Sequence, residues 1–240
     1  MKNTMAEIRP SLFRLEAERV FKKSLEVPSA SCGAEIDASL LLDFLESRKD
    51  YEKYKFDACL IHIIGEALFN LPEMNLKWEG TGKESKIIKH ESLNLGIAVR
   101  IPRNKETGAA VIRVREEIKD GEKDLWHMNL WELNRILRDI SERVKIVKIF
   151  VKDFNPRPNI VFNNLGVFKN IDFGYPILPA DVSIMVSAFR AKVKPVIFKG
   201  YIMPKPIMNL TVTFDHRLFD GPHIDNFLGI LKEKIENPRF

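Results

Sequence analysis

The chain has 240 residues, of which 45% are apolar and 30% are charged. This balance is typical of a folded globular protein and excludes a mainly disordered chain. The sequence has no run of eighteen apolar residues and no apolar signal core at its amino terminus, so we expect neither a membrane span nor secretion. Two cysteines, Cys32 and Cys59, are too few for a disulfide framework or a zinc cluster, and we expect a cytoplasmic protein.

The net charge of +5 raises the question of a nucleic-acid partner. Acidic residues are interspersed with the basic ones, as in segments 113–119 and 232–236, which is typical of solvated helix faces. We therefore expect no nucleic-acid partner. A small ligand that carries phosphate groups fits the positive charge equally well.

The first half of the chain predicts helices and one strand. An amphipathic helix is expected over residues 11–26 and a strand over residues 29–37. Asp37 is suited to cap a second helix that follows it. Apolar residues at helical spacing predict a third helix over residues 56–71, which Pro72 ends.

The middle of the chain predicts two strands and a long helix. The strands cover residues 94–101 and 109–114, and the polar segment 104–108 is suited to the turn between them. Residues 129–149 form an amphipathic pattern with an apolar side, which predicts a helix.

The last third is rich in strand signals. Strands are expected over residues 160–162, 182–189, 194–197 and 207–216, with a turn over residues 198–201 and a final helix over residues 222–235. Strands and helices do not alternate regularly, so a mixed α/β or α+β sandwich is favoured over a doubly wound sheet. We expect residues 1–240 to form a single domain.

The strand over residues 207–216 alternates apolar and polar side chains. Leu210, Val212, Phe214 and His216 share one face, because successive side chains along a strand point to opposite sides. This pattern predicts that His216 points toward the interior.

The segment from His216 to Gly221 joins that strand to the final helix and contains the candidate catalytic residues of the chain. A strand end holds a side chain on a rigid element within reach of a cleft. Histidine is the side chain best suited to transfer a proton near neutral pH, and Asp220 could orient it or brace the turn. The motif alone leaves open a purely structural role for both residues.

Other chemistries find weaker support in the sequence. Nucleotide-binding glycine loops, zinc-protease motifs and the serine elbow are absent. His223 and His216 would need a third metal ligand such as Asp220 or Asp225, and their spacing matches no standard site, so we predict no metal. Within the helix over residues 56–71, Cys59 is interpreted as a packing residue rather than a nucleophile, and His62 as structural rather than a ligand.

Segment 206–221 resembles the catalytic domain of the dihydrolipoamide acyltransferases of 2-oxo acid dehydrogenase complexes. Its H-x-x-x-D-G pattern is shared with chloramphenicol acetyltransferase. Segments 71–80, 94–103 and 162–168, and the Val-Ile-Arg at 111–113, are also similar to the family in order and spacing. The resemblance extends from about residue 12 to the end of the chain.

The resemblance implies a chloramphenicol acetyltransferase-like two-layer sandwich, in which helices flank a mixed sheet. It also implies a homotrimer whose active sites lie at subunit interfaces and admit coenzyme A from one side and the acyl partner from the other. His216 stands at the family's general base and Asp220 at its mainly structural aspartate. Asn163 stands where the family has a serine or threonine that stabilises the oxyanion; an asparagine amide can also donate, but it changes the pocket.

We therefore predict a coenzyme A-dependent acyltransferase that acts on a dihydrolipoyl-type thiol. A thiol is mostly protonated at neutral pH, so His216 would take its proton before the sulfur attacks a thioester carbonyl. Two alternatives stay open: a chloramphenicol-type O-acetyltransferase, and a coenzyme A-binding scaffold trimer in which the change at Asn163 has weakened catalysis.

The resemblance also sets expectations for assembly. The chain is expected to lack the family's lipoyl and subunit-binding domains, so that any lipoyl group comes in trans from lipoyl-carrying or dehydrogenase-complex proteins. It ends without the family's longer apolar tail, which favours a trimer over a large cage.

Overall fold

The computed structural model describes residues 9–47, 55–103, 106–114, 127–146 and 158–240. Its α-helices in these ranges are α1 (Leu12–Ser24), α2 (Ser39–Ser47), α3 (Lys55–Asn70), α4 (Leu130–Ile146) and α5 (Gly221–Glu236). Short 3-10 helices cover Pro72–Met74 and Gly82–Glu84. The strands are β1 (Ser29–Asp37), β2 (Leu76–Glu79), β3 (Lys86–Lys89), β4 (Leu95–Arg103), β5 (Glu106–Arg113), β6 (Ile160–Asn164), β7 (Ile184–Ala188), β8 (Lys192–Phe198) and β9 (Tyr201–Asp215).

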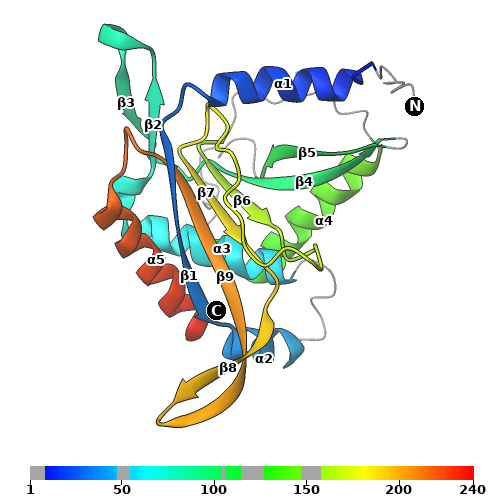
Figure 1. The fold of residues 1–240 in the computed structure, drawn as a ribbon, viewed down its shortest axis with the longest axis vertical. Helices are drawn as coiled ribbons and strands as arrows, with labels where there is room; N and C mark the ends of the chain where they lie inside the picture. Colours follow the sequence, from blue (N-terminus) through cyan, green and yellow to red (C-terminus); the bar gives the residue numbers. More distant parts are fainter. Residues whose placement is uncertain (1–8, 48–54, 104–105, 115–126, 147–157) are drawn as a thin grey trace, which may run out of the picture.

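A mixed sheet forms the centre of the described part of the molecule (Figure 1). Its strands lie in the order β1-β9-β7-β6-β4-β5, and β8 pairs with the free end of β9. Neighbours β4, β6 and β7 are parallel, whereas the other pairs are antiparallel. The predicted mixed sheet is therefore confirmed. A separate two-stranded sheet, β2 with β3, stands at one corner.

The main hydrophobic core lies between one face of the sheet and the helices. Phe162 of β6 and Phe214 of β9 are buried there with the apolar sides of α2, α3, α4 and α5. The opposite face carries a smaller cluster, which consists of Val27, Val161, Leu178, Val182 and Met185. The predicted two-layer sandwich is confirmed, because helices cover one face with a large core while loop segments rest on the other.

Most predicted elements are found with shifted ends. The helix predicted over residues 129–149 is α4, which ends at Ile146; residues 147–149 lie outside the described residues. β5 begins at Glu106, inside the segment predicted as a turn, and residues 104–105 of that segment are also outside the described ranges. The helix α5 begins with Pro222 in its first turn, as predicted.

Two strand regions were not predicted. β2 and β3 have four residues each, of which two in each strand are charged, so they lack the longer apolar run that marks a strand. β9 begins at Tyr201 instead of residue 207, because Pro204 and Pro206 interrupt the strand signal. Along the described ranges, no helix combines the length and apolar character that a membrane crossing requires.

Candidate active site

His216 follows the last residue of β9, and its position corrects the sequence prediction. Its backbone N–H donates to the carbonyl of Pro28 at 2.9 Å, and its ring centroid lies 5.5 Å from that of Phe214. The side chain is nevertheless 49% exposed. The prediction of an interior histidine was wrong because β9 ends at Asp215: strand alternation directs the ring toward the side of Phe214, but beyond the edge of the core.

A paired aspartate and arginine flank His216 along the chain. Arg217 donates from Nε to Asp215 Oδ1 at 2.9 Å and from Nη2 to Oδ2 at 2.6 Å. The Arg217 backbone N–H also donates to Oδ1 at 3.0 Å, and its guanidinium stacks on Trp78 at 4.8 Å. Because Asp215 is almost fully buried, this two-point contact fixes the backbone on both sides of His216.

Asp220 stands at the beginning of α5 and faces His216. Its Oδ1 lies 3.4 Å from His216 Nδ1. The Asp220 N–H donates to Nδ1 of His223 at 3.2 Å, so the side chain of His223 helps to cap the beginning of α5. A carboxylate at a helix amino terminus is favourable. The geometry agrees with the bracing role expected of Asp220. No cluster of three or more metal-ligating side chains occurs among the described residues.

Asn163 lies far from His216 in the same chain. Strand register places Asn163 opposite Ser187 and Ser187 opposite Thr211, five residues before His216 on β9. The two residues are thus about 16 Å apart along the strands and about 10 Å apart across them. They also lie on opposite faces of the sheet, since His216 is five positions after Thr211 and an odd step along a strand changes the face. The structure does not bring His216 and Asn163 together within one chain.

The surroundings of Asn163 are polar and partly buried. Its neighbour Ser187 is fully buried, and the Ser187 hydroxyl has no hydrogen-bond partner among the described residues. In the next strand, Thr211 donates through Oγ1 to the carbonyl of Gly174 at 3.1 Å. This row of polar side chains lies beneath the connection between β6 and β7.

A buried carboxyl supports the strand end that carries Asn163. Asn164 donates through Nδ2 to Asp57 Oδ1 at 2.6 Å, and its Oδ1 accepts the N–H of Gly166 at 2.9 Å. Burial in the first turn of α3 raises the pKa of Asp57 to about 6, although the hydrogen bond from Asn164 acts in the opposite direction. The contacts link α3 to the turn after β6 and so hold Asn163 in place.

The sequence did not identify the residues that support His216 and Asn163, which are Asp215, Arg217, Asp57 and Asn164. Asp215 and Arg217 lie directly before and after His216, and an acidic and a basic residue two positions apart at the end of a strand can pair, which is the signal that could have identified them. Asp57 and Asn164 carry no comparable signal, because their contact joins residues 107 positions apart.

The surroundings of Cys59 and His62 indicate that both residues have structural roles. Cys59 is buried in the main core, in agreement with a packing role. The His62 ring lies 5.6 Å from Phe240, and its Nε2 is 3.8 Å from a carboxylate oxygen of Glu66. A cavity of about 370 Å³ adjoins this region, lined by Ile63, Glu66, Glu233, Lys234, Asn237, Arg239 and Phe240. It lies near the carboxyl end of α5, about 20 Å from the helix start beside His216.

Relatives of known sequence share most of this chain. It is 26% identical over 228 residues to a probable dihydrolipoyllysine-residue succinyltransferase component of the 2-oxoglutarate dehydrogenase complex from Schizosaccharomyces pombe. A succinyltransferase component from Haemophilus influenzae is 26% identical over 231 residues. The matches cover 92% of this chain but 47% and 51% of the two relatives, so the chain spans about half their length.

Solved structures show the same fold at low sequence identity. The cubic core of the pyruvate dehydrogenase multienzyme complex has a TM-score of 0.81 at 20% identity, over 98% of this chain and 93% of that chain. An Azotobacter vinelandii dihydrolipoamide acetyltransferase, studied for the catalytic roles of a serine, a histidine and an asparagine, has a TM-score of 0.80 at 20% identity, with the same coverage. Chloramphenicol acetyltransferase has a TM-score of 0.52 at 12% identity, over 92% of this chain and 95% of that chain.

These similarities confirm the predicted fold class, a mixed sheet flanked by helices as in chloramphenicol acetyltransferase. The sequence of the chain also matches the model of a protein family. It is the model of the 2-oxoacid dehydrogenases acyltransferase (catalytic domain), and it matches residues 4–240, almost the whole chain. This chain therefore belongs to the family of 2-oxoacid dehydrogenase acyltransferase catalytic domains.

Proposed function

We propose that this chain transfers an acyl group between coenzyme A and a dihydrolipoyl thiol, with His216 as the general base. The observation that carries the proposal is the setting of His216, which is half-exposed at the end of β9, lies between the ion-paired residues Asp215 and Arg217, and is 3.4 Å from the carboxylate of Asp220. The relatives from Schizosaccharomyces pombe and Haemophilus influenzae are dihydrolipoyllysine-residue succinyltransferases, which supports a thiol acceptor over a hydroxyl acceptor.

The geometry of His216 suits proton transfer. The carboxylate of Asp220 beside Nδ1 favours the imidazole tautomer that carries its proton there, which leaves the lone pair on Nε2. Nε2 then takes the proton of the coenzyme A thiol, whose ordinary pKa of about 8.5 leaves it mostly protonated at neutral pH.

The acyl transfer then proceeds through one tetrahedral intermediate. The thiolate of coenzyme A forms a C–S bond to the thioester carbonyl carbon of the acylated dihydrolipoyl group. The intermediate collapses when the C–S bond to the dihydrolipoyl sulfur breaks, and that sulfur receives the proton from His216. The reverse sequence acylates the dihydrolipoyl group from acyl-coenzyme A.

Asn163 is proposed as the donor that stabilises the intermediate. Its amide N–H can point at an oxyanion, and the contact of Asn164 with Asp57 holds the strand end that carries it. One such donor is worth around 3 kcal/mol of transition-state stabilisation in comparable sites. A serine belongs to the catalytic mechanism studied in the Azotobacter vinelandii enzyme, which supports a polar donor in this role.

The proposed site needs two copies of the chain. Because His216 and Asn163 lie on opposite faces and far apart along the sheet, one reaction can use both only if different copies supply them. Contacts between unlike surfaces form a ring when the rotation from one copy to the next closes, and we propose a closed ring of three copies, a homotrimer. The similarity to the cubic core of a multienzyme complex supports assembly of repeated copies.

We further propose that the dihydrolipoyl group is presented by another protein of a 2-oxo acid dehydrogenase complex. The support is that the relatives are components of such complexes. Coenzyme A acts as a substrate in this scheme.

The direct test measures acyl transfer from acetyl- or succinyl-coenzyme A to free dihydrolipoamide by chromatography of the product. His216→Ala should lower the rate roughly 10²–10⁴-fold, the usual loss for a general base. His127→Ala removes another exposed histidine and should keep the wild-type rate.

Two outcomes would contradict the proposal. The first is full activity in His216→Ala. The second is tight coenzyme A binding by calorimetry without transfer to any thiol, which would identify a scaffold trimer. Asn163→Ser then provides a comparison, because a large gain in rate would show an intact but weakened site. A hydroxyl acceptor, chloramphenicol, tests the O-acetyltransferase alternative in the same assay.

A further inference from the structure

Asp57 carries a partly buried carboxyl group in the first turn of α3, and this group has no ion pair in the described part of the chain. Its Oδ1 accepts the side-chain amide of Asn164 at 2.6 Å. Burial raises the pKa of Asp57 to about 6, although this hydrogen bond acts in the opposite direction. At neutral pH the carboxyl group is therefore mostly ionised, and its charge lowers the stability of the fold.

The cations of the neighbouring helices contact other groups. Both α4 and α5 pack against α3. Lys234 of α5 pairs with Glu66 at 2.9 Å, and Glu66 lies about 13 Å further along α3 than Asp57. Arg135 of α4 lies over the ring of Trp131 at 5.4 Å. Neither of these two cations is paired with Asp57.

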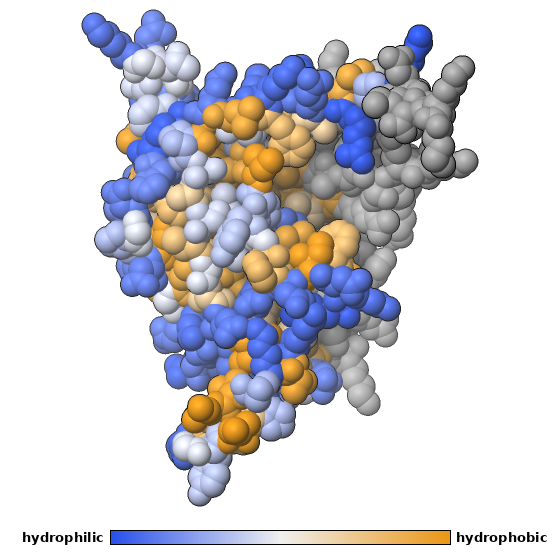
Figure 2. Space-filling model, in the orientation of Figure 1, coloured by the Kyte–Doolittle hydropathy of each residue, from blue (hydrophilic) through white to orange (hydrophobic). Residues whose placement is uncertain are grey.

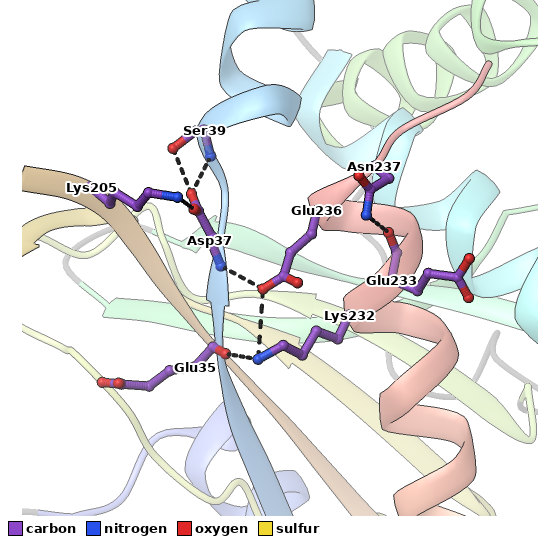
Figure 3. Close-up of polar contacts among 8 residues, drawn as sticks. All are labelled: Glu35, Asp37, Ser39, Lys205, Lys232, Glu233, Glu236 and Asn237. Atoms are coloured by element: carbon purple, nitrogen blue, oxygen red, sulfur yellow. Dashed lines mark hydrogen bonds and ion pairs between the residues drawn. The ribbon is translucent and has the colours of Figure 1, made fainter. Parts of the chain in front are cut away.

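Asp37 shows how the same chain holds a carboxylate that stabilises the fold (Figure 3). Lys205 pairs with this carboxylate, and the N–H of Ser39 donates to its Oδ1 at 3.0 Å. Burial alone would raise the pKa of Asp37, but these contacts lower it below its ordinary value. Asp57 has an amide as its partner instead of a cation, so stability does not account for its charge.

Asn164 connects Asp57 to the turn that follows β6. Its Nδ2 donates to Asp57, and its Oδ1 accepts the N–H of Gly166 at 2.9 Å. The carbonyl of Gly166 accepts Nε of Arg190 at 3.1 Å. A Cβ at Gly166 would lie 3.1–3.3 Å from Oδ1 of Asn164, the backbone N of Arg190 and the carbonyl carbon of Phe189. The turn is therefore packed closely on the segment that follows β7, and Asp57 holds it from the helix side.

Asn163 precedes Asn164 on β6 and so points to the opposite face of the sheet, away from α3. The connection from β6 to β7 crosses that face, where the carbonyl of Gly174 accepts the hydroxyl of Thr211 at 3.1 Å. In Figure 2 the surface over the strands is apolar or weakly polar, whereas charged residues gather along α1 and below the strands. An amide in weakly polar surroundings interacts strongly with a developing negative charge, so the position of Asn163 is important for its proposed role.

We propose that the carboxylate of Asp57 is a positioning group for acyl transfer, which holds Asn163 in place through the hydrogen bond to Asn164. The inference rests on the proposed function, in which the amide of Asn163 stabilises the tetrahedral intermediate. A hydrogen bond to a carboxylate is about twice as strong as one to a neutral acceptor. The charge of Asp57 thus lowers stability but fixes the strand end that carries the proposed donor.

A neutral amide at position 57 should hold Asn164 less firmly. Both oxygens of a carboxylate accept hydrogen bonds, so the amide of Asn164 finds an acceptor in either orientation of the group. Asp57→Asn offers one oxygen and one NH2 group, and the NH2 group cannot accept. The variant should therefore fold, because it loses the buried charge, and yet transfer acyl groups at least about fivefold more slowly at neutral pH.

The test measures kcat and KM of the full chain for transfer from acetyl-coenzyme A to free dihydrolipoamide. At pH 7.5, Asp57→Asn should lower kcat at least about fivefold and leave both KM values within about twofold, because Asn163 acts on the intermediate. The ratio of wild-type to variant kcat should approach 1 at pH 5, where Asp57 of the wild type is also protonated. The titration of His216 is common to both proteins and cancels from this ratio. Asp43→Asn changes an exposed carboxylate of α2 and should keep the wild-type kcat.

A second background shows whether Asp57 acts through Asn163. In Asn163→Ala the donor is missing, so the added change Asp57→Asn should slow transfer less than about twofold. An equal loss in both backgrounds would overturn the proposal, as would full activity of Asp57→Asn at pH 7.5 or a ratio that does not change with pH. Circular dichroism reports whether each variant is folded, and Asp57→Ser, another neutral acceptor, replaces Asp57→Asn if that variant is unfolded.

The outcomes separate this proposal from the proposed function. A wild-type chain that transfers no acyl group refutes the function and, with it, the role of Asp57. An active wild type with an equally active Asp57→Asn variant refutes the positioning role alone. Slower transfer by Asp57→Asn that disappears at pH 5 and in the Asn163→Ala background supports both.

Discussion

The buried carboxyl of Asp57 should lower the stability of this protein at neutral pH. Asp57 lies in the first turn of α3, where Asn164 donates a hydrogen bond to it at 2.6 Å. Asp57→Asn keeps the size of the side chain and an oxygen that can accept this hydrogen bond, but it removes the ionisable group. We predict that Asp57→Asn stabilises the protein at neutral pH and has little effect near pH 4.

The magnitude and sign follow from the raised pKa. Burial raises the pKa of Asp57 from 3.8 to about 6, so the folded protein holds a proton that the unfolded chain has released. Stability should therefore fall as the pH rises from about 4 to about 6, and the full cost above that range is about 3 kcal/mol. Below the ordinary pKa both states are protonated and the cost disappears.

Urea unfolding followed by circular dichroism at pH 4.0 and pH 7.5 measures this effect. The expected gain for Asp57→Asn is up to about 3 kcal/mol at pH 7.5 and near zero at pH 4.0. Asp225→Asn, which changes an exposed carboxylate on α5, serves as the control and should show no such difference. An equal effect of Asp57→Asn at both pH values, or a loss of stability at pH 7.5, would refute the reasoning.

Three further predictions concern the side chains of Arg217, Ser187 and Asp37. Arg217→Gln leaves the buried carboxylate of Asp215 without its charged partner and should cost about 3–5 kcal/mol in urea unfolding, more than Arg217→Lys costs. Ser187→Ala removes a buried hydroxyl without a partner in the described part of the chain, and it should change stability by less than about 1 kcal/mol. Partial burial alone would raise the pKa of Asp37, but the hydrogen bonds headed by that of Lys205 lower it below 3.8. Its stabilisation should therefore be present above pH 3.8 and disappear as the pH falls through the lowered value, so Asp37→Asn should flatten acid unfolding curves below pH 4.

The strands and helices could be predicted from the sequence where the periodicity of apolar residues was strong. The helix α3 and the inner part of β9 follow this pattern because one side of each is buried in the main core. The hairpin of β8 and β9 was predicted only as a turn between two short segments, because prolines interrupt the strand signal and no third strand lies beside the outer part of the hairpin. Patterns of burial report what packs inside one chain and are silent about surfaces that another chain covers.

The candidate site was only partly accessible for the same reason. His216 and Asp220 belong to one local motif and are found together. Asn163 was identified by resemblance alone, and nothing in the local sequence could show that it lies on the opposite face of the sheet. The contact of Asp57 with Asn164 and the stacking of Arg217 on Trp78 depend on tertiary structure, because each joins residues that lie far apart in the sequence.

Mixing two inactive variants tests the shared site most directly. His216→Ala and Asn163→Ala copies are combined in equal amounts, exchanged, and checked for mixed assemblies by mass spectrometry before acyl transfer to dihydrolipoamide is measured. If each site takes His216 from one copy and Asn163 from the next, about one quarter of the sites regain both residues, and the mixture should recover about one quarter of the wild-type rate. A mixture that has exchanged copies yet stays at the average rate of the two variants would contradict a site shared between subunits.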